Sequence, residues 1–260
     1  MKRTQVKKTA ALKWEQAQEL GNVDEMKKYA SRTAVLTKEM IHDAQQVITA
    51  LGLPIVQAPS EGEAQTAHMV SRGDAFASVS QDYDNLIFGC PLLLRNLSIE
   101  GRRKQPGKLA YVIVKPELIA LQEVLQTLHM TLDQLIVTAI LVGTDYNPGG
   151  IKGIGPKTAV KLVQEHDTSM AGFEQLFKEV AWEKHNPDTA WNEIFGTIKD
   201  MPVRDDYALA WKPINLTQLQ KLLIDEHDFS EERVRKKMDV LGGEQKKKAQ
   251  SGLSEFFGGK

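Results

Sequence analysis

Short apolar runs alternate with helical patterns through the first half of the chain. Four of these runs are rich in apolar and β-branched residues and predict strands: 53–57, 76–80, 92–97 and 108–114. One helix is predicted from Asp24, which can cap it, to Leu51, with Gly52 as its stop. Another is predicted to open at Ser60 as its cap. Strands that alternate with helices predict an α/β fold, with a polar turn at 100–107.

Helical periodicity dominates the second half. Three helices are predicted there, at 116–128, 132–143 and 157–166. The middle one is almost entirely apolar and should be buried. Residues 167–243 are predicted to be helical, with Trp182, Trp191 and Trp211 as core or surface anchors rather than stacking platforms. After Gly243 the composition turns polar and rich in lysine, which is typical of a disordered linker.

Five carboxylates gather in three short clusters, and each cluster directly follows an apolar or β-prone run. They are Glu61 and Glu63, Asp82 and Asp84, and Asp145. At the carboxyl ends of strands these acids can converge, and a hard divalent cation is the usual remedy for their repulsion. A carboxylate-bound metal pair serves attack on a phosphodiester. The alternative is that acids in a first helical turn merely stabilise the helix dipole.

Composition narrows the class of protein. With 260 residues, 42% hydrophobic content and a net charge of −1, the chain is typical of a soluble globular protein. Its single cysteine, Cys90, excludes an internal disulfide and a cysteine-based zinc site, and its apolar neighbours predict a buried thiol. The six histidines show no ligand spacing. We expect an intracellular protein, since neither a signal peptide nor a membrane span is evident.

A glycine-rich turn follows Asp145. Gly153, Ile154 and Gly155 precede Pro156, which suits a first helical position, and then Lys157. Backbone amides at a helix N-terminus bind phosphate, so the pattern predicts a helix-hairpin-helix that grips DNA without reading its sequence. An ordinary interhelical turn is the alternative.

Both ends of the chain carry candidate binding segments. The C-terminal segment places four residues on one side of a tight helical turn: Gln250, Leu253, Phe256 and Phe257. Aromatic residues after a flexible linker favour a docking peptide over a sticky terminus. The basic N-terminal helix is either a solvated face or a phosphate-gripping element.

These motifs resemble those of the archaeal and eukaryotic flap endonucleases. The resemblance rests on 58–64, 80–89 and 143–159 in this order and spacing, with 229–235 in support and 250–257 similar to a sliding-clamp (PCNA) docking box. It implies a PIN-like nuclease domain, a mostly parallel sheet flanked by helices whose N-terminal strands are missing, with a helix-hairpin-helix.

The resemblance also implies roles for single residues. Glu61, Glu63, Asp82, Asp84 and Asp145 would bind two Mg²⁺ ions, directly or through water, with Mn²⁺ as the alternative ion. Arg3 best matches the family's active-site arginine, which polarises the scissile phosphate. The turn at Gly153, Ile154 and Gly155 would bind DNA together with Lys157, and a K⁺ ion through backbone carbonyls.

Five segments are expected from this resemblance. They are an arch remnant with a connecting helix at 1–51, a catalytic region at 52–130, the helix-hairpin-helix at 131–166, a helical part at 167–243 and the tail at 244–260. Family members begin upstream, with the first strands and two more active-site aspartates. The expectation is therefore either a shortened product or gene model, or a partner that supplies the rest.

The expected function is structure-specific cleavage of 5′ flaps in DNA replication, including Okazaki fragment processing, and in repair, with 5′–3′ exonuclease activity. The expected partners of a monomer are flap or branched DNA and the sliding clamp, without a membrane. The expected location is the cytoplasm of an archaeon or a eukaryotic nucleus. One alternative is a catalytically incomplete DNA- and clamp-binding fragment, and a second is a metal-dependent RNase of related fold.

Overall fold

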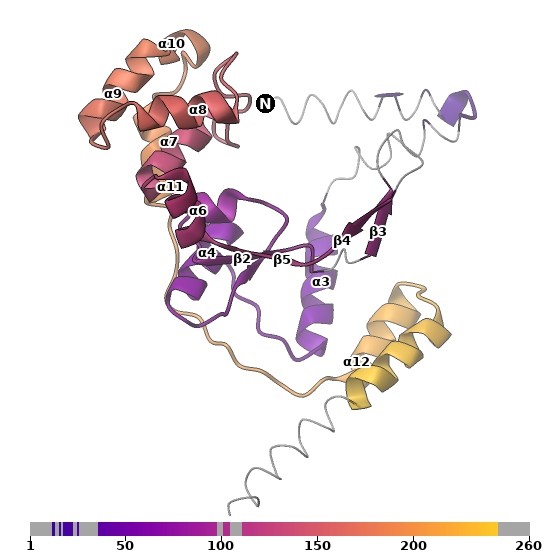
Figure 1. The fold of residues 1–260 in the computed structure, drawn as a ribbon. Helices are drawn as coiled ribbons and strands as arrows, with labels where there is room; N and C mark the ends of the chain where they lie inside the picture. Colours follow the sequence, from indigo (N-terminus) through magenta and orange to yellow (C-terminus); the bar gives the residue numbers. More distant parts are fainter. Residues whose placement is uncertain are drawn as a thin grey trace, which may run out of the picture. The chain divides into compact units, whose positions relative to one another are not determined.

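The described part of the chain divides into two units (Figure 1). The computed structural model describes residues 12, 13, 16, 18–22, 25, 36–97, 101–104 and 111–243. The first unit combines Met1–Val56 with Ala208–Lys260, and the second is Gln57–Tyr207. The first unit therefore combines stretches from both ends of the chain. The five segments predicted from the sequence are consecutive stretches, and they stay a prediction.

The regular secondary structure of the first unit is helical where it is described, and residues 53–56 and 208–215 form no helix or strand. It contains α3 (Lys38–Ala50), α12 (Leu216–Gln220), the π-helix η1 (Lys221–Glu226) and a helix through residues 231–243. Ala50 packs with Leu219 and Leu222. Gly52 ends α3 at a φ of +77°, and a Cβ there would lie 2.0 Å from the carbonyl oxygen of Lys212, so this stop requires glycine.

The start of α3 differs from the predicted helix. Thr37 is extended and its hydroxyl accepts a hydrogen bond from the Met40 amide at 3.2 Å, so Thr37 is the cap and the helix begins at Lys38. The predicted cap, Asp24, lies outside the described residues. An unbroken helix to Leu51 is therefore wrong, because a β-region cap interrupts it.

A mixed sheet lies at the centre of the second unit. It consists of β1 (Ser78–Val79), β2 (Leu92–Arg95) and β5 (Glu117–Ala120) in the order β1-β2-β5. β1 is parallel to β2, and β2 is antiparallel to β5. Three helices belong to the same part of the unit: α4 (Gly62–Ser71), α5 (Asp84–Ile87) and α6 (Leu121–Leu128). In Figure 1, β2 and β5 run side by side next to α4 and α6.

Several strand predictions are wrong in their bounds. Residues 53–57 form no strand, since Pro54 lacks a backbone N–H. The predicted turn at 100–107 contains β3 (Gly101–Lys104), which pairs with β4 (Tyr111–Val114). The predicted helix at 116–128 begins only at Leu121, because its first residues pair with β2 as β5. Ser60 is not a cap, because Glu61 occupies that position.

Five helices complete the second unit. They are α7 (Leu132–Val142), α8 (Pro156–Gln164), α9 (Met170–Glu179), α10 (Trp182–His185) and α11 (Trp191–Lys199). Thr131 and Gln134 form a capping box at the start of α7, as the sequence pattern of a buried helix requires. The ring of Phe177 stacks on Trp191 with centroids 4.5 Å apart, which confirms Trp191 as a core anchor. Residues 201–215 are not helical, contrary to prediction.

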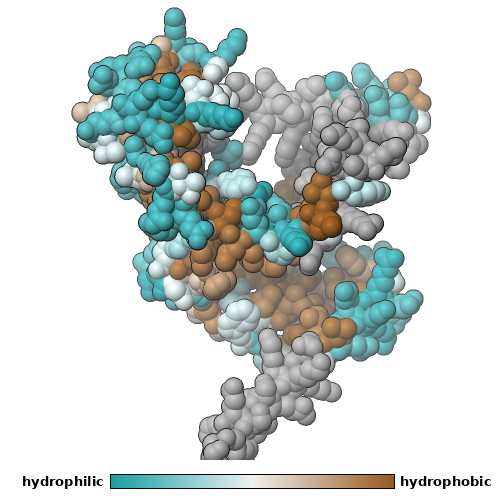
Figure 2. All heavy atoms as spheres, in the orientation of Figure 1, coloured by the Kyte–Doolittle hydropathy of each residue, from teal (hydrophilic) through white to brown (hydrophobic). Residues whose placement is uncertain are grey.

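The surface is divided between polar and apolar regions. Hydrophilic side chains cover the outer faces of α9 and α10 in Figure 2. Apolar side chains remain exposed near the edge strand β1, where Val79 is 58% and Phe76 is 76% exposed. In the described ranges no single helix is long and apolar enough to cross a membrane, and the bent pair of α6 and α7 passes that test only together.

Candidate active site

The five predicted acids lie in the second unit, at the ends of four elements. Glu61 is the N-cap of α4 and Glu63 lies in its first turn. Asp82 follows β1, Asp84 opens α5, and Asp145 follows α7. Burial raises the pKa of Asp84 above its ordinary value, and the charges of the other four acids raise it further. The fold therefore brings all five into one electrostatic cluster, as expected from the sequence.

Hydrogen bonds order the acids locally. The Asp84 amide donates to Asp82 Oδ1 at 3.1 Å, and the Asp82 amide donates to the Ser80 hydroxyl at 3.1 Å. The Tyr146 hydroxyl donates to Glu61 Oε1 at 3.3 Å. Burial, followed by the charge of Glu61, raises the pKa of Tyr146 to about 12. The phenol therefore stays protonated and donates to Glu61 at neutral pH.

A buried asparagine holds the loop that carries Asp145. Asn147 is 4% exposed, and its Oδ1 accepts from the Thr144 hydroxyl at 2.7 Å and the Thr144 amide at 3.2 Å. Its Nδ2 donates to the Ile140 carbonyl at 2.7 Å, which ties the loop to α7. Sequence reasoning did not single out Asn147 or Tyr146, although both lie in the matched motif.

The glycine-rich turn lies between α7 and α8. Gly153 has a φ of +93°, which favours glycine, and the Ile154 amide donates to the Ile151 carbonyl at 3.0 Å. Gly155 is the N-cap of α8 at a φ of −94°, a backbone angle that other residues also adopt. A Cβ on Gly153 or Gly155 would meet no atom within 4 Å. Lys157 is exposed beside this open backbone.

Comparison with known proteins decides the family. The model of the XPG I-region matches residues 52–145. The chain is 46% identical to flap endonuclease 1 of Pyrococcus horikoshii over 256 residues, which are 98% of this chain and 72% of that protein. Flap endonuclease 1 of Thermococcus onnurineus is also 46% identical, over 99% of this chain and 72% of that protein. The chain belongs to the flap endonuclease family.

Solved structures agree with this assignment. The structure of flap endonuclease-1 from Methanococcus jannaschii matches with a TM-score of 0.66 and 39% identity, over 85% of this chain and 62% of that one. A structure described as the catalytic core of Rad2 in complex with DNA substrate matches with a TM-score of 0.62 at 18% identity, which concerns the fold alone. These matches confirm the predicted PIN-like nuclease fold.

The donor set of this flap endonuclease family member suits a divalent metal ion in its chemistry. Five hard oxygen donors repel one another, as the raised pKa of Asp84 records, and a cation would relieve that repulsion. Within the described ranges, no three His, Cys, Asp or Glu side chains stand close enough together to hold an ion. The five acids are the residues that would bind it, and their role as ligands stays a prediction.

Other predicted site residues of the family pattern lie outside the described residues. They are Arg3 near the N-terminus and the docking residues Gln250, Leu253, Phe256 and Phe257. Cys90 is described and fully buried, which confirms the predicted structural thiol, and burial raises its pKa.

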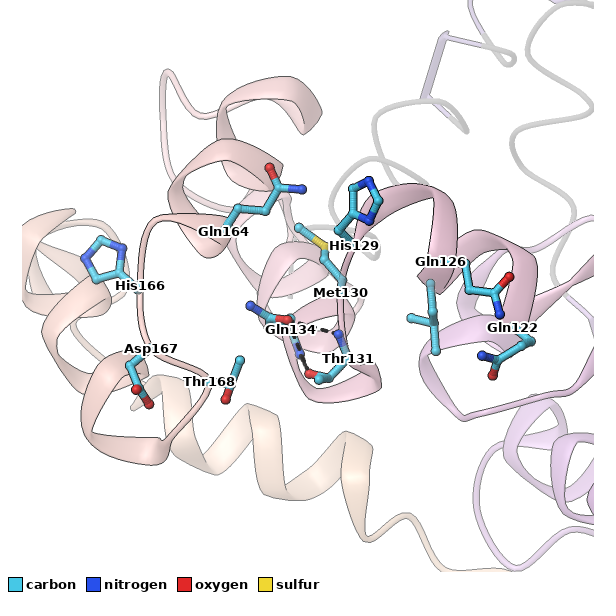
Figure 3. Close-up of a pocket in the computed structure, with 11 residues that line it drawn as sticks. Gln122, Gln126, His129, Met130, Thr131, Gln134, Gln164, His166, Asp167 and Thr168 are labelled. Carbon is cyan, nitrogen blue, oxygen red and sulfur yellow. Dashed lines mark hydrogen bonds between the residues drawn. The ribbon is translucent and has the colours of Figure 1, made fainter.

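A pocket of about 850 Å³ lies away from these acids, at the ends of α6 and α8 (Figure 3). Two of its glutamines donate hydrogen bonds to backbone carbonyls. Gln134 Nε2 donates to the Val163 carbonyl at 3.3 Å, and Gln164 Nε2 donates to the Leu128 carbonyl at 2.6 Å. None of the predicted site residues lines this pocket.

Proposed function

We propose that this chain is a structure-specific endonuclease that cleaves 5′ flaps in DNA and also acts as a 5′–3′ exonuclease. The observation that carries the proposal is that the charges of four acids, from several elements, act on Asp84 in a chain of the flap endonuclease family. Its biological setting would be Okazaki fragment processing and DNA repair, as the family name suggests.

The acids would hold two Mg²⁺ ions, with Mn²⁺ as a substitute. Such ions, when bound, polarise a phosphodiester and stabilise the charge that develops during hydrolysis. Two residues of the chain orient these acids. The Tyr146 hydroxyl donates a hydrogen bond to the Glu61 carboxylate, and Asn147 holds the loop that carries Asp145. Arg3 would stabilise the scissile phosphate, by its resemblance to the family arginine.

The helix-hairpin-helix would hold the duplex. Gly153 and Gly155 leave open backbone at the N-terminus of α8, where a phosphate can approach closely. The backbone carbonyls of this turn would hold a K⁺ ion. Lys157 adds a positive charge at the same place. A structure described as the catalytic core of Rad2 in complex with DNA substrate shares the fold of this chain.

The tail would dock the enzyme on the sliding clamp through Gln250, Leu253, Phe256 and Phe257. We propose a monomer that acts without a membrane, in the cytoplasm of an archaeon or the nucleus of a eukaryote. Clamp binding is tested by a pull-down of the full chain with PCNA, in which Phe256→Ala with Phe257→Ala should abolish capture.

Cleavage of a labelled 5′-flap DNA in Mg²⁺ tests the catalytic proposal. We expect incision near the flap junction, and loss of about 100-fold or more in kcat for Asp84→Ala. Glu193→Ala serves as the matched control, since Glu193 is an exposed acid on α11. Single-stranded RNA in the same assay tests the RNase alternative. Unchanged activity of Asp84→Ala would refute the proposed site.

A non-catalytic DNA- and clamp-binding protein is the second candidate function. It is favoured by the observation that no three acids of the described residues are close enough to hold an ion. Calorimetric titration with Mg²⁺ separates the two candidates. Two saturable sites support the nuclease, while one weak site or none supports the binding protein.

A further inference from the structure

A small polar cluster lies beneath the acids, formed by Thr66, Ser78 and Asn85. Asn85 is fully buried and Ser78 is 4% exposed, whereas Thr66 reaches the surface. Asn85 Oδ1 accepts from the Ser78 hydroxyl at 2.6 Å and from the Thr66 hydroxyl at 3.3 Å. The two hydroxyls are 3.1 Å apart. The three side chains therefore form a triangle of polar contacts, with two hydroxyl hydrogens shared among its three sides.

Each member of this triangle sits on a segment that carries predicted metal ligands. Thr66 is on α4, and its hydroxyl is 3.0 Å from the carbonyl oxygen of Glu63. Ser78 is on β1, the strand that leads to Asp82. Asn85 directly follows Asp84 in α5, and its Nδ2 donates to the Asp82 carbonyl at 3.2 Å. Four of the five acids thus lie on backbone joined by one triangle.

The chemistry of position 85 is demanding. The side chain must accept from two hydroxyls and donate to a carbonyl at the same time, which an amide can do. Aspartate would lose the donor and add a buried charge beside Asp84. Leucine has the same number of side-chain heavy atoms but makes none of the three bonds, so the hydroxyl of Ser78 would lose its acceptor at 2.6 Å.

Electrostatics explain why such a tie is needed. The acids on α4, after β1 and on α5 repel one another, and nothing but the fold holds these segments together before an ion binds. Hydrogen bonds in a buried, low-dielectric place resist such displacement better than exposed ones do. The hydrogen bonds of the triangle would therefore keep the acids at the distances from one another that binding of an ion requires.

We propose that Asn85, together with Thr66 and Ser78, is a positioning residue that sets the spacing of the acid-bearing segments and thereby the affinity for divalent ions. The inference deepens the proposed function and rests on it. None of the three side chains touches substrate. Each acts through the acids.

The test measures binding of Mn²⁺ alone, without DNA, by electron paramagnetic resonance. Removal of a partner that orients a metal ligand typically weakens affinity about 10- to 100-fold, and we expect Asn85→Leu to fall in this range. Phe177→Leu is the control, because Phe177 is a buried core residue of α9 remote from the triangle. It lowers stability without touching the acid-bearing segments.

Hydrogen exchange in metal-free buffer supplies a second readout. In Asn85→Leu, exchange should rise in the peptides that cover 61–66 and 80–85 but not in the peptide that covers 170–179. Thr66→Val, at an exposed position, carries the test if Asn85→Leu does not fold. Its effect on Mn²⁺ affinity should be less than additive with that of Asn85→Leu, since both break one triangle.

Equal Mn²⁺ affinity in Asn85→Leu and Phe177→Leu would overturn the inference. For Thr66→Val, affinity equal to that of the wild type would do the same. Flap cleavage distinguishes this result from failure of the proposed function. A wild type that binds Mn²⁺ but leaves flap DNA intact refutes the nuclease, while the comparison of affinities still decides the role of Asn85. In an active enzyme, Asn85→Leu should lower kcat and leave KM for the flap unchanged.

Discussion

Asp84 is the acid of the cluster whose pKa is raised by burial and by the other carboxylates. It is partly buried, and four other carboxylates act on it. Its position could be predicted from the sequence, because acids two residues apart after a strand form a recognisable pattern. Asn85, one residue further, could not be predicted as important. Its role depends on burial and on Thr66 and Ser78, which the fold brings to it from other elements.

Replacing Asp84 should stabilise the metal-free protein. A raised pKa means that the folded state disfavours the charged carboxylate. The stabilisation from a neutral Asp84 is present below the unfolded pKa of about 3.9 and is lost as the pH rises through the folded pKa. At pH 7 in EDTA, Asp84→Asn should raise the thermal midpoint by about 2 °C.

Calorimetry at pH 7 and at pH 3.5 checks this prediction. The difference between wild type and Asp84→Asn should shrink at the lower pH, which lies below both pKa values, so that Asp84 is mostly protonated in both states. The increment is small because solvent screens a partly exposed carboxyl. A variant that is less stable than the wild type at pH 7 would contradict the prediction.

Single elements show where local pattern and tertiary pairing disagree. The helices α7 and α8 begin and end close to where periodicity, caps and Pro156 predict. β5 lies in a stretch with helical periodicity, but its backbone pairs with β2 over four residues. β3 lies in a charged stretch that reads as a turn, and an edge hairpin tolerates such charges. A local sequence pattern does not show which distant strand a segment pairs with, so these strands could not be predicted from it.

Two glycines of the turn between α7 and α8 should respond differently to the same substitution. A Cβ on Gly150 would lie 2.3 Å from the Val142 carbonyl, and φ is +52° there. Gly155 has open space and occupies a cap position that serine favours. We expect Gly150→Ser to cost about 2 kcal/mol or more and Gly155→Ser to be neutral or stabilising. Urea unfolding of both variants provides the measurement.

The segment at 204–207 is fastened to α4 by charged side chains and by Gln65. Asp205 accepts from His68 Nε2 at 2.8 Å and from Arg72 Nη1 at 2.5 Å. The buried side chain of Gln65 makes two hydrogen bonds with the Arg204 backbone. Its Oε1 accepts from the Arg204 amide at 2.9 Å, and its Nε2 donates to the Arg204 carbonyl at 3.0 Å. α4 carries Glu63, so this fastening also steadies the acid cluster.

Asp205→Asn should therefore weaken the second unit in a pH-dependent way. The hydrogen bond from His68, with the charges of His68 and Arg72, lowers the pKa of Asp205. Its contribution is present above the unfolded pKa of about 3.9 and is lost as the pH falls through the lowered folded pKa. Thermal melts should separate wild type from Asp205→Asn at pH 7 and converge near pH 3. A constant difference would argue against this ion pair.

At the scale of the whole molecule, two units share one chain, and all five acids lie in the second. The sequence predicted the family's fold from its motifs. The division itself depends on contacts between the two ends of the chain, which no local motif records.

Binding of Mg²⁺ should stabilise the unit that contains the acids. A ligand present at 100 times its Kd stabilises the folded state by about 2.7 kcal/mol. Scanning calorimetry with Mg²⁺ against EDTA should show a higher midpoint for the transition of the second unit. Asp84→Ala should lose most of this shift, and a uniform shift in the variant would indicate nonspecific ionic effects.

The tryptophans give each unit a natural optical signal. Trp182 and Trp191 are 3% and 7% exposed in the second unit, whereas Trp211 in the first is 73% exposed. Buried indoles emit at shorter wavelength and resist quenching by acrylamide, while Trp211 should be quenched freely. With Trp14, which lies outside the described residues, replaced by Phe, a shift of emission to longer wavelength on heating follows the unfolding of the second unit, while quenching of Trp211 reports its exposure in the first.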